Sequence, residues 1–124
     1  MAEKILIVDD EPHIVTSLRF LMQQKGHDVE VIEDGQEALD YINSEIPKLI
    51  LLDVMLPSLD GYEVCQRIRQ NPKTAHIKII MLTAMGRSDD KEKGLELGAD
   101  LYVTKPFSTR QLVADVQALL GATS

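Results

Sequence analysis

The sequence contains only one cysteine, so the chain cannot form an internal disulfide bond. A catalytic thiol, the alternative role for that residue, needs a histidine base and an electropositive setting. Cys65 instead stands between Val64 and Ile68 in a helical pattern. Because a free cysteine usually behaves as a small hydrophobe, we expect Cys65 to be buried in the core.

Positive charge is also scarce, with 13 Lys and Arg against 20 Asp and Glu and a formal net charge of −7. Proteins bind nucleic acid by neutralising its phosphates with Lys and Arg. We therefore expect no direct binding of nucleic acid by this chain, and a DNA-binding role would need another domain.

Long apolar runs are absent as well, and none approaches the roughly 20 residues needed to span a bilayer. The N-terminus passes from Met1–Lys4 into a strand-like run without a basic leader, a long apolar stretch or a cleavage signal. We expect a cytoplasmic protein that makes no use of the membrane. Its 124 residues suit one compact domain over 1–124, either standing alone or cut from a longer chain.

Short apolar runs alternate with helical patterns along the whole chain. The expected strands are Lys4–Val8, Asp28–Ile32, Leu49–Leu52, Lys78–Leu82 and Leu101–Val103. The expected helices are Pro12–Gly26, Gly35–Asn43, Tyr62–Arg69, Ser88–Gly98 and Ser108–Gly121. Five such units without an internal linker predict an α/β fold, with a five-stranded parallel sheet and helices on both faces. We predict the doubly wound, flavodoxin-like (βα)5 arrangement with strand order 2-1-3-4-5.

Polar side chains stand where the expected strands end. Asp9 and Asp10 follow the first strand and Asp53 ends the third; Thr83 ends the fourth and Lys105 follows the fifth. In open α/β sheets, ligands bind outside the carboxyl ends of the strands, where the strand order reverses. That reversal lies between strands one and three, so the three aspartates should converge there, with Thr83 and Lys105 beside them.

Three clustered carboxylates repel one another, and a hard divalent cation resolves this repulsion. Mg²⁺ is bound by one or two carboxylates, waters and phosphate oxygens, so we expect Asp9, Asp10 and Asp53 to hold Mg²⁺. The alternative is that Asp9, Asp10 and Glu11 merely cap the next helix, where acids favour the positive end of its dipole. Capping accounts for Glu11, but not for a third acid across the sheet.

Mg²⁺ and Lys105 together would form an electrophilic pocket suited to a phosphoryl group. Asp53 is the candidate nucleophile, because carboxylates form acyl phosphates. The Thr83 hydroxyl is able to donate a hydrogen bond to a phosphoryl oxygen. Taken singly, Lys105 would be a solvated lysine and Thr83 a strand-end residue, but their shared location favours a joint role.

Six segments carry a resemblance to a known family. They are Ile5–Glu11, Leu52–Pro57, Asp60–Gly61, Met81–Ala84, Gly98–Asp100 and Thr104–Phe107. In this order and at these spacings, the chain resembles the receiver domain of two-component response regulators over nearly its whole length. The resemblance implies that Asp53 accepts a phosphoryl group from the phosphohistidine of a sensor histidine kinase or a histidine phosphotransfer protein. It implies no enzyme beyond Mg²⁺-dependent self-phosphorylation and self-dephosphorylation.

The resemblance also implies the remaining roles at the site. Asp10 would hold Mg²⁺ more directly than Asp9, the Met55 backbone carbonyl would be a further ligand, and Mn²⁺ would be able to replace Mg²⁺. Lys105 would pair with the phosphoryl group, and its peptide bond to Pro106 is expected to be cis, which is uncommon and usually has a structural purpose.

Thr83 and Tyr102 match the family's switch pair. Phosphorylation would draw the Thr83 hydroxyl toward the phosphate, and Tyr102 would then turn inward into the vacated space. This motion would remodel the face made by the fourth helix, fifth strand and fifth helix, the expected contact for an output domain, an effector protein or a second copy. The alternative is that Tyr102 is a half-buried strand residue with its hydroxyl in water.

That face departs from one pattern of the family. Its winged-helix transcription regulators often carry a charged dimer network there, which Asp100 and Arg110 fit. Charges commonly seen in that network are replaced by Leu101, Gln111, Asp115 and Gln117. Dimerisation through the network is therefore not favoured, and we expect Leu101 and Tyr102 to offer an apolar contact to another partner.

Three rival interpretations fit less well. A phosphatase of the haloacid-dehalogenase type needs a second acid two residues after its nucleophile, where Met55 stands. A flavodoxin-like nucleotide or FMN binder cradles phosphate with backbone amides, whereas the first loop here is acidic. A receiver-like scaffold that never accepts phosphate would not need the full set of site residues. Because neither Met55 nor Met85 beside the site can hold a hydrolytic water, we also expect slow self-dephosphorylation.

Overall fold

The computed structural model describes residues 3–84, 93 and 95–121. The strands are β1 (Lys4–Val8), β2 (Asp28–Ile32), β3 (Leu49–Asp53), β4 (Lys78–Ala84) and β5 (Leu101–Lys105). The helices are α1 (Pro12–Gln24), α2 (Gly35–Ser44), α3 (Gly61–Gln70) and α5 (Thr109–Gly121). Most of the helix expected over Ser88–Gly98 lies outside the described residues. Within the described part of the chain, no helix is long and apolar enough to cross a bilayer.

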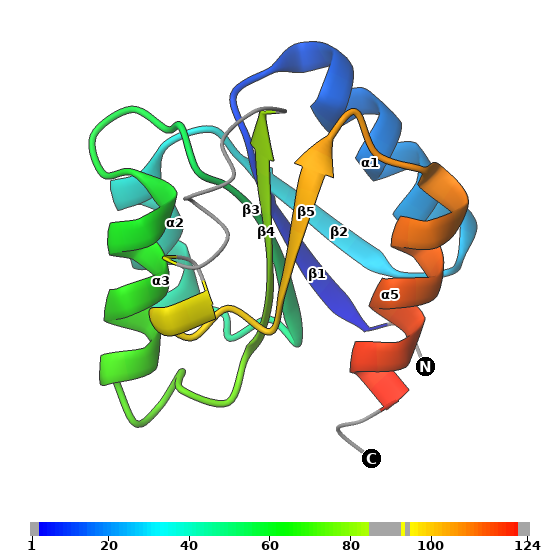
Figure 1. Ribbon diagram of the computed structural model, residues 1–124. Helices are drawn as coiled ribbons and strands as arrows, with labels where there is room; N and C mark the ends of the chain where they lie inside the picture. Colours follow the sequence, from blue (N-terminus) through cyan, green and yellow to red (C-terminus); the bar gives the residue numbers. More distant parts are fainter. Residues whose placement is uncertain (1–2, 85–92, 94, 122–124) are drawn as a thin grey trace.

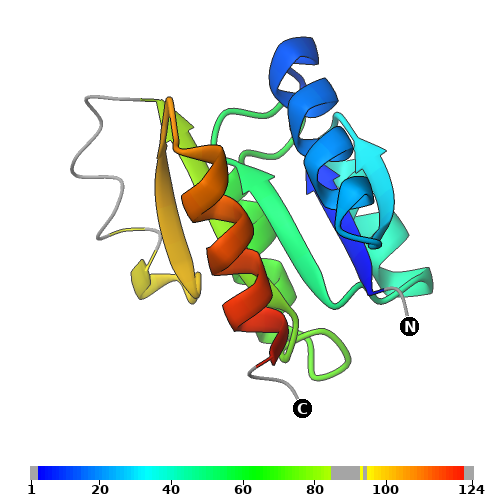
Figure 2. The same ribbon diagram turned by 90° about the vertical axis from the view of Figure 1, so that its right-hand side faces the viewer.

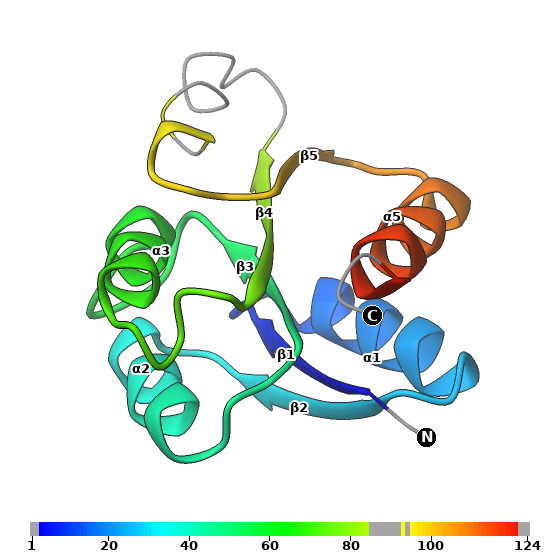
Figure 3. The ribbon, with the colours of Figure 1, turned by 90° about the horizontal axis from the view of Figure 1, so that it is seen from below.

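The five strands form one parallel sheet in the order β2-β1-β3-β4-β5, which confirms the predicted topology. Helices α2 and α3 cover one face of the sheet, and α1 and α5 cover the other (Figures 1 and 3). Figure 2 looks onto the second face, where α1 and α5 lie in front of the strands. Because all strands are parallel, their carboxyl ends meet at one edge of the sheet, at the top of Figure 1.

The core has two layers, divided by the sheet. Alternate residues of β3 point to opposite faces, so Ile50 packs in the layer under α2 and α3, and Leu51 packs in the layer under α1 and α5. Every residue of β3 is buried, as expected for a central strand covered on both sides. Cys65 is fully buried in the α2–α3 layer, which confirms the expectation, and burial raises the pKa of its thiol to about 11.

The last two strands run further than the apolar pattern indicates. β4 continues to Ala84 and β5 to Lys105, with Thr83 paired to Thr104 and Ala84 paired to Lys105. Strand pairing uses backbone groups, so it continues past the point where the side chains become polar. Because of this extension, Thr83 and Lys105 belong to the carboxyl ends of the strands themselves and not to the loops that follow them.

Arg69, near the end of α3, connects three separate parts of the fold. Its guanidinium donates hydrogen bonds to the backbone carbonyls of Ala75, Ile77 and Gly98. It also pairs with Asp100 over 2.9 Å, and Asp100 accepts a hydrogen bond from the Ile79 amide. The segments that enter β4 and β5 are therefore both tied to α3 by one side chain.

We expect Arg69→Ala to lower the free energy of unfolding by about 2 kcal/mol, because carbonyls and a carboxylate lose their donor. Urea denaturation measures the change. Arg67→Ala is a matched control on the same helix, since Arg67 forms an exposed ion pair with Glu63 one turn away. It should cost less than about 0.5 kcal/mol. Equal losses in the two variants would contradict the connecting role of Arg69.

Candidate functional site

Three carboxylates converge at the carboxyl edge of the sheet. Asp53 is the last residue of β3, and Asp9 and Asp10 directly follow β1, the strand beside it. One carboxylate oxygen of each aspartate lies within 4.8 Å of the other two. The convergence that the strand order predicted is therefore present in the structure.

The two aspartates that follow β1 differ in their surroundings. Asp9 is fully buried, and both of its carboxylate oxygens have partners. Its Oδ1 accepts the Glu11 amide over 2.9 Å, and its Oδ2 accepts Lys105 Nζ over 3.0 Å. Asp10, in contrast, is exposed to solvent.

Asp53 is buried beside another negative charge. Its residue is only 6% exposed, and this burial together with the charge of Asp9 raises the pKa of its carboxyl to about 6. The nearby charge of Lys105, whose Nζ lies 3.4 Å from Oδ1, and a hydrogen bond from the Met55 backbone act in the opposite direction. On balance, the folded protein disfavours the ionised form of Asp53. A positively charged ligand at this place would stabilise that form.

Lys105 is the cation that faces this cluster. Its Nζ lies 3.0 Å from Asp9, 3.4 Å from Asp53 and 3.9 Å from Glu11. Burial by itself would lower the pKa of Lys105, but its hydrogen bond to Asp9 and the three neighbouring carboxylates raise the pKa overall. The side chain therefore stays an ammonium. Its peptide bond to Pro106 is cis, in agreement with the expectation.

The donor set fits a hard divalent cation. Oxygen atoms, among them those of carboxylates, are the ligands that Mg²⁺ prefers. Burial and the charge of Asp9 disfavour the ionised form of Asp53, which such an ion would stabilise. Glu11 stands at the N-cap of α1, the positive end of the helix dipole, although its side chain makes no capping hydrogen bond. Glu11 instead lies near Lys105, a contact that the sequence did not indicate.

Two buried hydroxyls, those of Thr83 and Tyr102, have no hydrogen-bond partner within the described part of the chain. Thr83 is 1% exposed, and its Oγ1 has no hydrogen-bond partner among the described residues. The Tyr102 hydroxyl is likewise buried without a partner there, and its ring packs on the α2–α3 layer of the core. The alternative that places the Tyr102 hydroxyl in water is therefore wrong. Met85, expected beside the site, lies outside the described residues.

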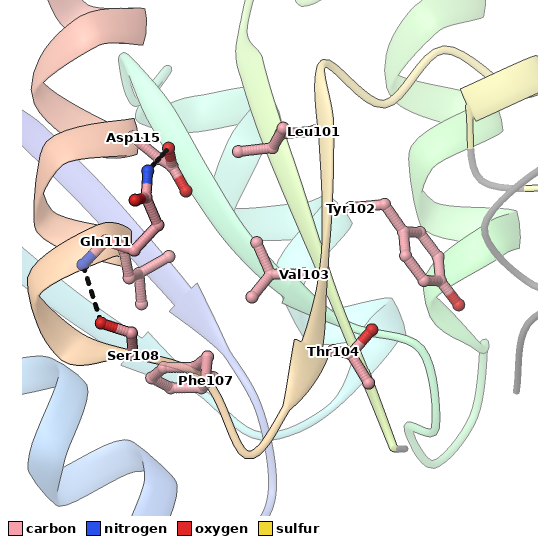
Figure 4. A pocket seen from close by; sticks show the side chains of 9 residues that line it. Leu101, Tyr102, Val103, Thr104, Phe107, Ser108, Gln111 and Asp115 are labelled. Atoms are coloured by element: carbon pink, nitrogen blue, oxygen red, sulfur yellow. Dashed lines mark hydrogen bonds between the residues drawn. The ribbon is translucent and has the colours of Figure 1, made fainter. Parts of the chain in front are cut away.

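The expected partner face is only partly described, because most of its fourth helix lies outside the described residues. Between β5 and α5 there is a groove of about 330 Å³ (Figure 4). Leu101 and Val103 point toward α5, whereas Tyr102 points to the opposite side of the strand (Figure 4). Leu101 and Tyr102, neighbours along the edge strand β5, therefore face opposite sides of the sheet. The expected apolar contact of these residues with a partner stays a prediction.

Two residues near the site escaped the sequence analysis. Asp34, the N-cap of α2, accepts a hydrogen bond from Ser58 in the loop between β3 and α3. The sequence does hold one signal, since Asp34 followed by Glu37 has the spacing of an N-terminal cap. Nothing in the sequence links that cap to a serine 24 residues away.

Comparison with known proteins assigns the family. The model of the response regulator receiver domain matches residues 5–117. The alkaline phosphatase synthesis transcriptional regulatory protein PhoP of Bacillus subtilis (strain 168) is 52% identical over 120 residues, which make up 97% of this chain and 49% of PhoP. The chain thus spans about half the length of that curated relative.

Solved structures agree with this assignment. A response regulator structure from Chloroflexus aurantiacus J-10-fl is 38% identical with a TM-score of 0.94, covering 98% of this chain and 99% of that one. The receiver domain of the sensor histidine kinase PA1611 from Pseudomonas aeruginosa PAO1, which has a magnesium ion coordinated in its active site cleft, is 31% identical. Its TM-score is 0.89, with 98% and 99% of the two chains covered. The chain therefore belongs to the response regulator receiver domain family, whose members are signalling domains rather than classical enzymes.

Proposed function

We propose that this chain is a single receiver domain over 1–124 that accepts a phosphoryl group on Asp53. The donor is the phosphohistidine of a sensor histidine kinase or a histidine phosphotransfer protein. The observation that carries the proposal is the position of Asp53, buried between the carboxylates of Asp9 and Asp10 and the ammonium of Lys105. A nucleophilic carboxylate with a fixed cation beside it suits phosphoryl transfer, which depends on positioning and charge neutralisation.

The transfer assigns a role to each residue. A carboxylate oxygen of Asp53 attacks phosphorus while the bond from phosphorus to the donor's imidazole nitrogen breaks. The Lys105 ammonium neutralises negative charge on the phosphoryl oxygens. The Thr83 hydroxyl, which has no hydrogen-bond partner among the described residues, donates a hydrogen bond to one of them. Mg²⁺, held by Asp9, Asp10, Asp53 and the Met55 carbonyl and replaceable by Mn²⁺, supplies further charge neutralisation when bound. The magnesium ion in the PA1611 receiver domain supports this choice of cofactor.

We propose that the signal leaves the site through Thr83 and Tyr102. Engagement of the Thr83 hydroxyl by the phosphoryl group changes what the neighbouring Tyr102 side chain packs against. Tyr102 belongs to β5, so the change reaches the face that β5 shares with α5 and the preceding helix. The partner on that face is an output domain, an effector protein or a second copy. The greater length and the regulatory name of PhoP support an attached output domain and a cytoplasmic location, with any DNA binding left to that domain.

The test is the mass of the intact protein after incubation with phosphoramidate and Mg²⁺. We expect a single phosphate adduct in the parent protein and none in Asp53→Asn, because an amide cannot form the acyl phosphate. Asp40→Asn is a matched control on the exposed side of α2 and should keep the adduct. Chelation of Mg²⁺ should abolish it. A parent protein that takes no phosphate would sink the proposal, and an adduct that persists in Asp53→Asn would assign it to another residue.

A further inference from the structure

The loop between β3 and α3, residues 54–60, is fastened to the start of α2. The Asp34 carboxylate uses its two oxygens for different purposes: Oδ1 accepts the Glu37 amide over 3.0 Å, and Oδ2 accepts the Ser58 hydroxyl over 2.5 Å. Next to it, the Gly35 amide donates to the carbonyl of Pro57 over 3.2 Å. Asp34 therefore caps its own helix and holds the neighbouring loop at the same time.

The fit at this junction is close. A Cβ atom on Gly35 would lie 2.1 Å from the carbonyl oxygen of Leu59, so only glycine allows the approach. Ser58 has a φ of 69°, in the left-handed region that residues other than glycine rarely adopt. Its bond to Asp34 offsets the cost of that conformation. The loop shape thus depends on this contact rather than on the intrinsic preference of serine.

The other end of the loop is fixed to the sheet. The Val54 amide donates to Leu82 of β4 over 3.0 Å, and the Gly61 amide donates to Val54 over 2.8 Å. Met55 lies along the chain between Val54 and Ser58. The residue is 59% exposed, whereas its backbone hydrogen-bonds the Asp53 carboxylate. Met55 therefore contacts the phosphorylation site through its backbone.

We infer that Asp34 and Ser58 are positioning residues for the phosphorylation site, and that their hydrogen bond holds the Met55 backbone where Mg²⁺ binds. The inference rests on the proposed function, because it takes Asp9, Asp10 and Asp53 as the magnesium site. Mg²⁺ demands near-ideal octahedral geometry, so its affinity depends on how well each ligand is held beforehand. Groups that orient metal ligands from outside the coordination shell commonly change metal affinity when removed.

Two substitutions remove the bond and leave the helix cap in place. Ser58→Ala deletes the donor. Asp34→Ser keeps an oxygen for the Glu37 amide, since serine caps helices about as well as aspartate, but has no second oxygen for Ser58. We expect each variant to weaken Mg²⁺ binding to the unphosphorylated protein about fivefold, the effect of one hydrogen bond of ordinary strength. The double variant should be no weaker than either single one, because all three lack the same bond.

Mg²⁺ titration calorimetry measures the affinity, and amide hydrogen exchange of the metal-free protein reports the loop itself. The Gly35 amide, which bonds Pro57, should exchange faster in both variants by a similar factor. With saturating Mg²⁺, the rate of phosphorylation by phosphoramidate should return to that of the parent. Ser44→Ala is the matched control, because Ser44 donates a hydrogen bond to Tyr41 within the last turn of α2, at the end of that helix away from Asp34. Its Mg²⁺ affinity should stay within about twofold of the parent, within the scatter expected of an exposed site.

The outcomes separate the positioning role of Asp34 and Ser58 from the proposed function of the chain. A parent that binds Mg²⁺ and takes phosphate, with both variants matching its Mg²⁺ affinity, overturns the positioning role and leaves the proposed function intact. Faster exchange or lower stability without a change in Mg²⁺ affinity also overturns it, since the bond would then only support the fold. A parent that binds no Mg²⁺ overturns both.

Discussion

In the absence of divalent cations, Asp53→Asn is expected to raise the free energy of unfolding by about 2–3 kcal/mol at pH 8. Removal of the phosphate acceptor would thus stabilise the protein. The reason is that the pKa of Asp53 is about 6 in the folded protein, against an ordinary value of 3.8. Burial and the charge of Asp9 disfavour its ionised form, so the ionised carboxylate is better solvated in the unfolded chain. Asparagine has a similar shape and carries no charge.

The pH dependence follows from the direction of that pKa shift. Below about pH 4, Asp53 is protonated in both the folded and the unfolded protein, and the parent and Asp53→Asn should be equally stable. Between about pH 4 and pH 6 the unfolded chain loses the proton first, so the parent loses stability relative to the variant. Above about pH 6 both states are ionised and the difference should be constant.

Urea denaturation at pH 4, 6 and 8 with a chelator present measures this difference. Asp40→Asn, an exposed substitution on α2, should show no such dependence. A gap between parent and Asp53→Asn that stays the same at all three pH values would rule out burial of the Asp53 charge as its cause. Saturating Mg²⁺ should reduce or reverse this difference in the free energy of unfolding. A cation that binds the folded state stabilises it, and the parent protein, which keeps the Asp53 carboxylate, should bind Mg²⁺ better than Asp53→Asn.

The sequence predicted the site because the site follows from the topology. Continuous apolar character in Leu49–Leu52 identified the central strand, and the parallel order then put the residue after each strand at one edge. Asp9, Asp10 and Asp53 come together for that reason alone. The positions of these charged side chains could be predicted from the order of the strands, without knowledge of any loop conformation.

Features that depend on loop conformation were not predictable in this way. The contact between Asp34 and Ser58 joins residues 24 positions apart through a left-handed serine, a conformation that no sequence pattern indicates. The orientations of Leu101 and Tyr102 follow instead from the alternation of side chains along a strand, which places the two residues against different layers of the core.

The second large effect concerns Lys105. We expect Lys105→Met to lower the free energy of unfolding by about 3 kcal/mol at pH 8 without divalent cations, as for other buried ion pairs that lose one partner. Its side chain is 13% exposed and faces Asp9 at 3.0 Å and Asp53 at 3.4 Å. Methionine keeps the length and the apolar stem, so the loss is mainly electrostatic. Lys73→Met, at an exposed position, is the matched control and should cost less than about 0.5 kcal/mol.

A double-mutant cycle separates charge from packing. If Lys105 acts by neutralising Asp53, then Lys105→Met should cost about 1–2 kcal/mol less in the Asp53→Asn background than in the parent. The rest of the loss belongs to Asp9, which remains buried and charged in both backgrounds. Mg²⁺ should recover much of the stability of Lys105→Met, since it also neutralises these carboxylates. An equal loss of stability in both backgrounds would contradict the neutralisation of Asp53 by Lys105. A loss that Mg²⁺ does not change would assign the effect of Lys105 on stability to packing.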